Sequence, residues 1–293
     1  MMRSIFSFRT LFYVMYGVGL TVALLYIRFP TEKFRTYCEI KVTRTLSASN
    51  CKIGSIVYLF PLQVRFNQIQ IIENTAAKPL FVLDSVDISP RGLKFWQTFS
   101  VDSQFYGGSF TSVGTVEWGE MSFKLGNIVA EGVDLASWTK ELNLLKRGIT
   151  GLLSFTGDYA ATFNQPFSGS GQGLLNIDSG KMELSQPVLS LTEISYKAIR
   201  SKWQYKEDVL DFAEGVFDGK ELKGEFSGSV TVNPYLAKSV LGLAGQLEAQ
   251  TGFLKKNPKE QRLVKRLLRR YKMAVLPFKI GGTVKRPTFR FTT

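Results

Sequence analysis

The chain has no histidine and only two cysteines among its 293 residues. The absence of histidine excludes Ser-His-Asp and Cys-His catalysis, histidine-ligated metals and imidazole acid–base chemistry. Two thiols are too few for a zinc or iron–sulfur site built on cysteine. The 24 acidic residues fall in no recognisable catalytic motif. We therefore expect a protein that is not an enzyme and that needs no cofactor and no metal.

Long apolar runs are also scarce, because the chain contains only one. Leu11–Ile27 has no charged residue and lies between Arg9 and Arg28. As a helix it would be about 25 Å long, and extension back through Phe8 brings it near the roughly 30 Å of a bilayer's hydrocarbon core. No small-residue cleavage pattern follows the run. This favours an uncleaved transmembrane anchor over residues 1–29, with a cleaved signal peptide or a buried core helix as the alternatives.

The net charge of +13 is unevenly distributed along the chain. Residues 1–52 carry a net charge of +6 and residues 255–272 carry +8, whereas residues 53–254 carry −5. A nucleic-acid-binding domain more often spreads basic residues over its own surface, so we expect no nucleic-acid partner. The charges beside the apolar run do not decide which side of a membrane the body occupies, because long domains cross largely regardless of charge.

The two cysteines lie in a segment, residues 30–52, that follows the apolar run. Residues 31–47 have apolar side chains on roughly one helical face, which predicts an amphipathic helix at the membrane surface or capping the next domain. In an oxidising compartment, Cys38 and Cys51 could form a disulfide that closes a short loop and stabilises the fold by roughly 3 kcal/mol. They could equally be two small apolar residues, one of them packed on the helix. The sequence leaves both readings open.

Residues 53–293 read as a β-rich domain. Apolar and polar residues alternate in many short segments, separated by turn signals such as Asn-Gln-Pro and Asp-Ser-Gly. A change of phase near Asn67 and Gln68 predicts a β-bulge. Helical spacing of apolar residues predicts amphipathic helices over 133–147 and 258–272. The fold class is therefore mainly β: an N-terminal transmembrane helix, then a large curved antiparallel sheet of ten or more strands with two or three amphipathic helices.

A glycine-rich stretch, Gly169–Gly173, invites comparison with phosphate-binding loops. Such a loop should follow a strand and open a helix. Here the glycines keep the phase of one strand, and the chain continues with LLNID. They are expected to be small residues where a sheet packs closely against another element.

The helix over residues 258–272 carries the one charge cluster that could be a site. A solvated helix face is the simplest interpretation, and contact with anionic lipid headgroups or an acidic partner is the second. Nucleic acid is disfavoured because Tyr271 is the only aromatic residue among the charges. The candidate residues for contact with an anionic surface are Lys259, Arg262, Lys265, Arg266, Arg269 and Arg270.

The expected apolar face of the sheet is continuous and wider than two helices can cover. Two kinds of interior are consistent with such a face. The phenylalanine-rich faces could fill a closed core, or a long curved sheet could hold acyl chains along a groove. The sequence does not separate the closed core from the groove.

The order of segments resembles a known family. The anchor ends in an FP-x-E-like element, FPTE, and KIGSIVYLFPLQVRFNQIQI follows, ending at Ile71. PLFVLDSVDISPRGLKF, then FYGG at Phe105–Gly108, and LPFKIGGTVKRPTFRF at Leu276–Phe291 complete the pattern. This order resembles the type II secretion system protein N (GspN) family within the broader AsmA-like group.

The resemblance implies a single-pass protein of a bacterial inner membrane with its C-terminal β domain in the periplasm. It implies a non-catalytic accessory role in type II protein secretion, as a periplasmic scaffold or interaction protein whose partners are the inner membrane and other type II secretion components. AsmA-like relatives imply an alternative, a β module that binds or transfers phospholipid between the inner and outer membranes. The family offers no catalytic residues.

Overall fold

The computed structural model describes residues 8–27, 30–46, 48–60, 62–74, 79–92, 94, 96–142, 148–271 and 275–292. Its helices are α1 (Phe8–Ile27), α2 (Thr31–Thr45), α3 (Leu135–Leu142), the 3₁₀ turn η1 (Leu236–Lys238), α4 (Thr251–Lys256) and α5 (Pro258–Tyr271). Its strands are β1 (Ser49–Leu59), β2 (Gln63–Glu73), β3 (Pro79–Pro90), β4 (Thr98–Phe105), β5 (Gly108–Glu117), β6 (Ser122–Asp134), β7 (Leu152–Thr162), β8 (Gln165–Val188), β9 (Leu191–Lys206), β10 (Val209–Gly219), β11 (Leu222–Thr231), β12 (Val240–Ala249), β13 (Leu276–Thr283) and β14 (Arg286–Phe291).

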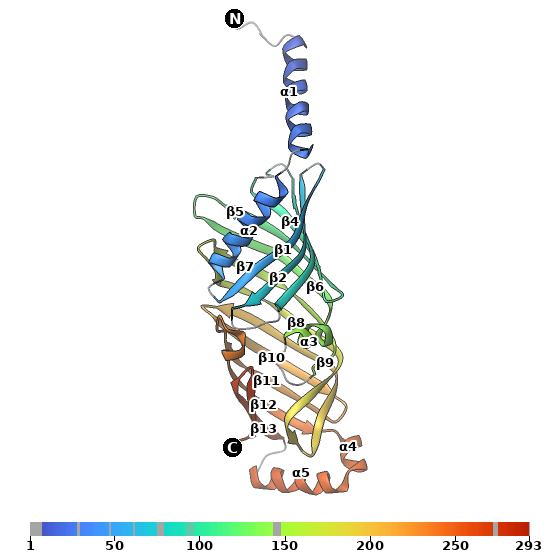
Figure 1. Ribbon diagram of the computed structural model, residues 1–293. Coiled ribbons are helices and arrows are strands. Elements are labelled where there is room, and N and C mark those ends of the chain that lie inside the picture. Colours follow the sequence, from blue (N-terminus) through green and yellow to red (C-terminus); the bar gives the residue numbers. More distant parts are fainter. Residues whose placement is uncertain are drawn as a thin grey trace, which may run out of the picture.

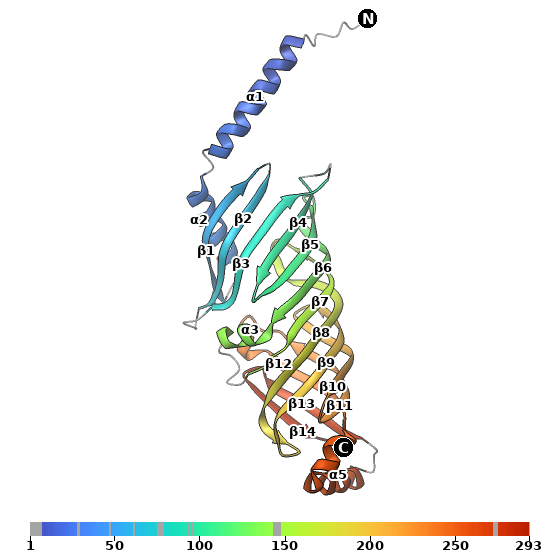
Figure 2. The same cartoon turned by 90° about the vertical axis from the view of Figure 1, so that its right-hand side faces the viewer.

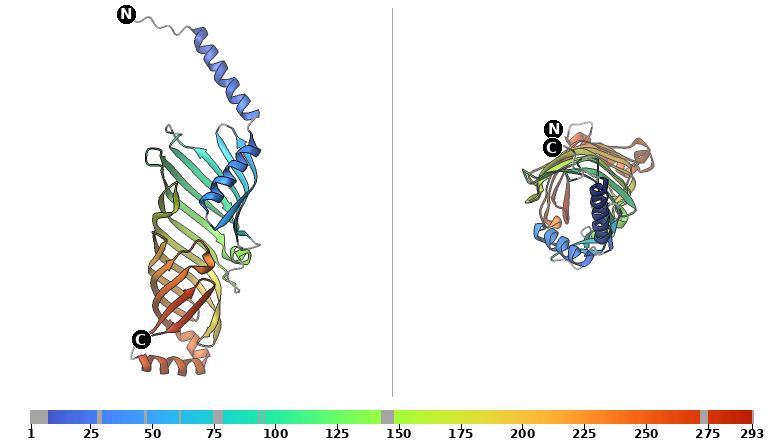
Figure 3. Two further views of the ribbon diagram at one scale, coloured as in Figure 1. Left: turned by 60° about the vertical axis from the view of Figure 1, so that its left-hand side comes forward. Right: turned by 90° about the horizontal axis from the view of Figure 1, so that it is seen from above.

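All the strands form one antiparallel sheet of 14 strands, in which each strand pairs with its neighbours in the chain. Figure 1 shows an elongated body with α1 at one end and α5 lying across the opposite end. Seen along the length of the body, the sheet is strongly curved (Figure 3, right). The predicted fold class, a mainly β protein with a large antiparallel sheet and few helices, is confirmed.

Among the residues that the structure describes, no helix is long and apolar enough to cross a membrane. The predicted anchor covers residues 1–29, of which residues 1–7 and 28–29 lie outside the described residues. The anchor therefore stays a prediction.

One apolar face runs across the sheet because the strand register places apolar residues opposite one another. A row on this face crosses β8 to β13 through Ile177, Ile199, Phe217, Gly224, Leu247 and Leu276. The adjacent row on the other face is mostly polar and passes through Asn176, Arg200, Val216, Glu225 and Gln246. Alternation within each strand thus gives the sheet an apolar concave face and a polar outer face.

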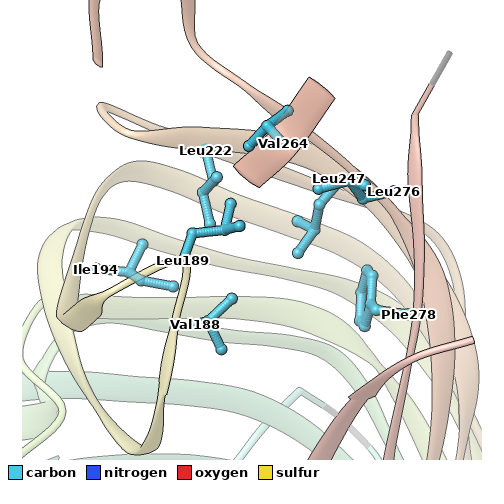
Figure 4. Close-up of a cluster of buried hydrophobic side chains, with 8 residues drawn as sticks. All are labelled: Val188, Leu189, Ile194, Leu222, Leu247, Val264, Leu276 and Phe278. Carbon is cyan, nitrogen blue, oxygen red and sulfur yellow. The ribbon is translucent and has the colours of Figure 1, made fainter. Parts of the chain in front are cut away.

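At the end farthest from α1 the apolar face closes into a packed core (Figure 4). The turn of the β8–β9 hairpin folds inward with Val188 and Leu189, and α5 covers this end with Val264. Leu222 and Leu276 lie between them and are almost completely inaccessible to solvent. This part of the molecule is therefore the closed core that the sequence left open as one alternative.

At the opposite end, α2 lies along the edge strand β1. The backbone N–H groups of Cys51 and Ile53 donate to Thr43 Oγ1 at 3.0 Å and Glu39 Oε1 at 2.8 Å. The Arg35 guanidinium donates to the Gly54 carbonyl at 3.1 Å. These bonds occupy edge groups that would otherwise be free to pair with another strand. The helix thus caps the sheet, and the sheet itself begins at Ser49, inside the segment 30–52.

The prediction of a β-bulge near Asn67 and Gln68 is wrong, although the side chains do change phase there. The pairs Ile53–Ile69 and Ser55–Asn67 keep one register, so β2 contains no inserted residue there. Gln68 instead has a left-handed backbone with φ of 54°. This conformation changes the phase of the side chains, and Phe66 and Ile69 join the same apolar cluster.

The predicted helices exist with shorter bounds. The helix expected over 31–47 ends at Thr45, and the one expected over 258–272 ends at Tyr271, with Lys272 outside the described residues. The helix expected over 133–147 is α3, which begins at Leu135 after the N-cap residue Asp134. Residues 143–147 of that prediction lie outside the described residues.

Candidate functional site

A cavity of about 450 Å³ lies in the concave side of the sheet, between segments that are distant in the chain. Its wall combines the end of α2 and the adjoining parts of β1 to β3, the β7–β8 turn, and the loop that leads from β11 to η1. Apolar side chains dominate the lining, including Ile71, Phe81, Phe167 and Leu236. A cavity of this size and character is typical of a site for a small or chain-like apolar ligand.

Two tyrosines hold the start of β8 at the wall of this cavity. The Tyr159 hydroxyl donates to the Pro166 carbonyl at 2.7 Å and accepts from the Gly169 N–H at 3.2 Å. The Tyr205 hydroxyl donates to the Phe167 carbonyl and lies 3.1 Å from Asp208 Oδ1.

Burial is the main cause that raises the pKa of both Tyr159 and Tyr205, and nearby Asp208 adds to it. Both phenols therefore stay protonated near neutral pH and serve as hydrogen-bond donors that position the start of β8.

A row of aromatic rings leads from an exposed rim of the sheet to this cavity. Trp118 stacks on Phe163 with 6.4 Å between ring centroids, and Phe163 lies 5.4 Å from Phe123. Phe123 lies 6.3 Å from Tyr159, which lies 6.1 Å from Tyr205 in the cavity wall. The row crosses β6, β7 and β9 and joins the rim to the cavity through contacts between the rings.

The rim is unusually apolar at the turns between strands. Large side chains are exposed in the β1–β2 turn at Phe60 and Leu62, in the β3–β4 connection at Trp96, and in the β5–β6 turn at Trp118. Trp118 Nε1 donates to the Trp96 carbonyl at 3.0 Å, which holds two of these turns together. The β1–β2 turn and the β3–β4 connection lie at the end of the sheet next to α1 (Figure 2).

The glycine-rich stretch lies on the apolar face, as the strand phase predicts. Gly171 and Gly173 in β8 pair with Tyr205 and Trp203 in β9. A Cβ atom at Gly171 would lie 3.3 Å from the Trp203 ring, and one at Gly173 would lie 1.8 Å from the Thr156 carbonyl oxygen. The glycines therefore let the indole and neighbouring strands approach closely, and they form no phosphate loop.

Trp203 also carries an orphan polar group on the apolar face. Its Nε1 is buried, and no hydrogen-bond partner for it is found within the described parts of the chain. Buried donors of this kind usually have a partner, so this N–H is an unsatisfied polar group within the apolar face.

The cysteines are brought together in one apolar cluster with Ile53, Ile56 and Phe34. Both are free thiols in the structure, with Cys51 buried in β1 and Cys38 half-buried on α2. Burial raises the pKa of Cys51 to about 11, and the charges of Glu39 and Cys38 add to this shift. The Cys51 thiol is therefore protonated and poorly reactive in the folded state.

The predicted basic residues all lie on α5 at the end of the sheet farthest from α1 (Figure 1). Lys259, Arg262, Lys265, Arg266, Arg269 and Arg270 are exposed to solvent. The opposite side of the helix packs Val264, Leu267 and Leu268 on the distal core. The structure thus gathers these six cations on one surface, well separated from the cavity.

No family model, curated protein or solved structure matches this chain. Within the described parts of the chain, no group of three or more cysteine, aspartate or glutamate side chains is placed to hold a metal ion. The geometry of the concave face is accordingly the main guide to function.

Sequence reasoning missed the aromatic residues that shape the site. Trp203 and Tyr205 belong to β9, a strand that the alternation of residues did not reveal. The signal that could have found them is the glycine spacing in β8, because glycines in an inward phase require a bulky side chain from a neighbouring strand to fill the space.

Proposed function

We propose that this protein is a non-catalytic lipid-binding β module, whose curved sheet holds acyl chains along its apolar concave face. The observation that carries this proposal is the apolar cavity of about 450 Å³ between the end of α2, strands β1 to β3 and the start of β8. The packed distal core fills the far end of the apolar face, so the space for a chain lies on the side toward α2. Burial of apolar chain against apolar wall provides the driving force.

The aromatic row supports a route for the chain into the cavity. Its rings extend from Trp118 at the exposed rim to Tyr205 at the cavity wall. Aromatic rings offer a large apolar surface that a sliding chain can follow without unpaired polar groups.

The membrane in this proposal is the source of the lipid. Eight large apolar or aromatic side chains of α1 are exposed: Leu11, Phe12, Tyr13, Val14, Met15, Tyr16, Leu20 and Leu24. Exposed apolar surface of this extent is typical of a membrane or partner contact. With residues 1–29 as the anchor, the apolar rim next to α1 would stand at the membrane surface. The resemblance to AsmA-like proteins supports the inner membrane and a periplasmic C-terminal domain.

Photocrosslinking from neighbouring residues tests this proposal. Phe212 and Asp211 are adjacent in β10 and point to opposite faces of the sheet, because Phe212 pairs with Trp203 and Asp211 with Gln204. A photoreactive side chain at position 212 should crosslink to phospholipid in the native membrane, whereas one at position 211 should not. Lipid crosslinks at neither position, or equally at both, would contradict acyl-chain binding.

We propose as a second candidate an accessory, scaffold role in the type II secretion envelope complex. The segments that carry the resemblance to the GspN family form most of the β1–β2 and β13–β14 hairpins at the two edges of the sheet. The polar outer face also offers a hollow of about 510 Å³ that Arg200, Asp218 and Lys223 line. Charged side chains of both signs line this hollow, which is a feature suited to a protein partner.

The secretion role has its own test. Mild crosslinking of the full chain in native membranes, followed by purification, should recover other secretion components. Recovery of none, with lipid crosslinks retained at position 212, would reject the scaffold role and leave lipid binding intact.

A further inference from the structure

A second surface of the molecule is strongly basic and lies at the opposite end from α1 (Figure 1). We define the basic end surface as the exposed basic residues of α4 and α5. They are Lys255, Lys256, Lys259, Arg262, Lys265, Arg266, Arg269 and Arg270. None of the ion pairs found in the described part of the chain includes any of them.

Nothing acidic on the two helices offsets this charge. Glu260 is the single acidic residue from Thr251 to Tyr271, and it is only 9% exposed. Its carboxylate therefore does not reach the surface that the cations cover. The eight cations therefore give the basic end surface a positive electrostatic potential, which attracts a surface of opposite charge.

The packing of α5 limits how it can meet a membrane. Val264 is 4% exposed, and Leu267 and Leu268 pack on the distal core. These packed residues are already in use, so α5 cannot insert this side among acyl chains without leaving the body of the protein. Of its leucines, Leu263 is exposed, so contact with a surface rests mainly on the charges of the exposed side.

We propose that the basic end surface docks on a bilayer surface rich in anionic lipid, other than the membrane next to α1. Two observations favour a bilayer. The cations are charge-complementary to anionic headgroups, and α5 lies across the end of the body (Figure 3, left). The apolar side of α5 packs on the distal core, so its exposed basic side faces away from the sheet. Its position opposite α1 means that a membrane at the α1 end cannot be the one that it contacts. The inference does not depend on acyl-chain binding in the cavity.

Vesicle capture by the full chain tests this docking. The protein is held on beads through an N-terminal tag in a nonionic amphipol, so that the basic end points outward. Fluorescent vesicles of phosphatidylcholine, with or without phosphatidylglycerol, are then added over a range of salt concentrations. Any binding by α1 is common to both kinds of vesicle and forms the baseline. We expect stronger capture of the anionic vesicles, and the excess should fall as salt screens the charges.

Matched variants test whether the stronger capture of anionic vesicles comes from the basic end surface. Changing Arg262, Lys265, Arg266 and Arg269 to glutamine should lower the affinity for anionic vesicles by roughly a hundredfold or more, because each basic side chain near an anionic surface adds its own attraction. The control changes four exposed lysines of the sheet and its turns, Lys124, Lys197, Lys206 and Lys220, to glutamine and loses the same charge. It should retain most of the capture. All eight side chains are exposed, so both variants should fold and melt like the parent protein.

Three results would overturn the proposal. One is equal capture of neutral and anionic vesicles. A second is an equal loss in the two variants, which would show an effect of net charge alone. The third is displacement of the vesicles by a polyglutamate peptide or duplex DNA at matched charge concentration, which would assign the surface to an acidic protein or a nucleic acid.

Discussion

The Trp203 indole of β9 lies directly over the main chain at Gly157 of β7. A Cβ atom at Gly157 would lie 2.7 Å from Trp203 Cζ2, closer than carbon atoms approach without displacement. Gly173 of β8 lies between the two residues and pairs with both. The Trp203 ring therefore fits on the apolar face only because Gly157 has no side chain.

Substitution of Gly157 by alanine should destabilise the protein by about 1–3 kcal/mol, because the added methyl group also meets the Gln172 carbonyl oxygen at 2.2 Å. Gly126→Ala in β6 is the matched control, since its nearest neighbour would be 3.9 Å away. Urea unfolding of both variants measures the difference. Equal stabilities would show that the indole and the strand move apart without cost.

Removal of the Glu39 side chain should weaken the cap on the edge of β1. Glu39→Ala leaves the Ile53 N–H without its acceptor, which costs about 1–2 kcal/mol in a partly buried position. Glu32→Ala, on the same helix, removes only an exposed pair with Arg35 and should cost less than about 0.5 kcal/mol. Denaturant unfolding compares the two, and the reverse order would contradict the edge-capping role of α2.

The cap on α3 predicts a dependence on pH. Asp134 accepts hydrogen bonds from the Ser137 hydroxyl at 2.6 Å and from the Ala136 N–H at 3.0 Å. The hydrogen bond from Ser137, then those from the backbone of α3, lower the pKa of Asp134 below its ordinary 3.8. The stabilisation is thus fully present above pH 3.8 and is lost as pH falls through the lower folded-state pKa.

Asp134→Ala should cost about 1 kcal/mol at neutral pH and remove this dependence, whereas Asp134→Asn should retain most of the cap. Thermal unfolding from pH 7 down to pH 3 measures both effects. A parent protein and an alanine variant that lose stability in parallel over this range would contradict the assignment.

The two thiols should differ in reactivity. Because burial raises the pKa of Cys51 to about 11, iodoacetamide at pH 8 should modify Cys51 much more slowly than Cys38, which is half-buried. Mass spectrometry of the native and the unfolded protein gives both rates. Rapid labelling of Cys51 would contradict its packing, and protection of both thiols until reduction would show that they pair in solution.

The large features of the fold follow from local patterns. Alternation in segments such as Leu276–Ile280 requires one apolar face, and a chain of short connections leads to an antiparallel sheet. Strand β9 was not predicted, because its inward residues Ile194, Tyr196 and Ile199 do not keep a constant period of two. Strand β4 was missed for a related reason. Its inward side chains are Val101, Ser103 and Phe105, and the polar Ser103 interrupts the apolar pattern.

The candidate site was less accessible to sequence reasoning than the fold. The cavity joins Ile71, Phe167 and Leu236, whose separation in the chain leaves no local signal of their contact. Residues with a left-handed backbone inside strands, such as Gln68 and Asn127, leave no periodic signal either. The basic residues of α5 were predicted in full because their chemistry lies within one helix, although their position at the end opposite α1 was not.

Detection of lipid in the cavity is the most direct test of the proposed lipid binding. Phe167 lines the cavity and is 54% exposed, while Leu174 is 56% exposed and belongs to the outer face. Phe167→Asp places a charge in the cavity wall, and Leu174→Asp places the same charge in solvent. Native mass spectrometry of the purified full chains should detect bound phospholipid in the parent protein and in Leu174→Asp but not in Phe167→Asp. A parent protein without lipid, or equal occupancy in the two variants, would contradict lipid binding in this cavity.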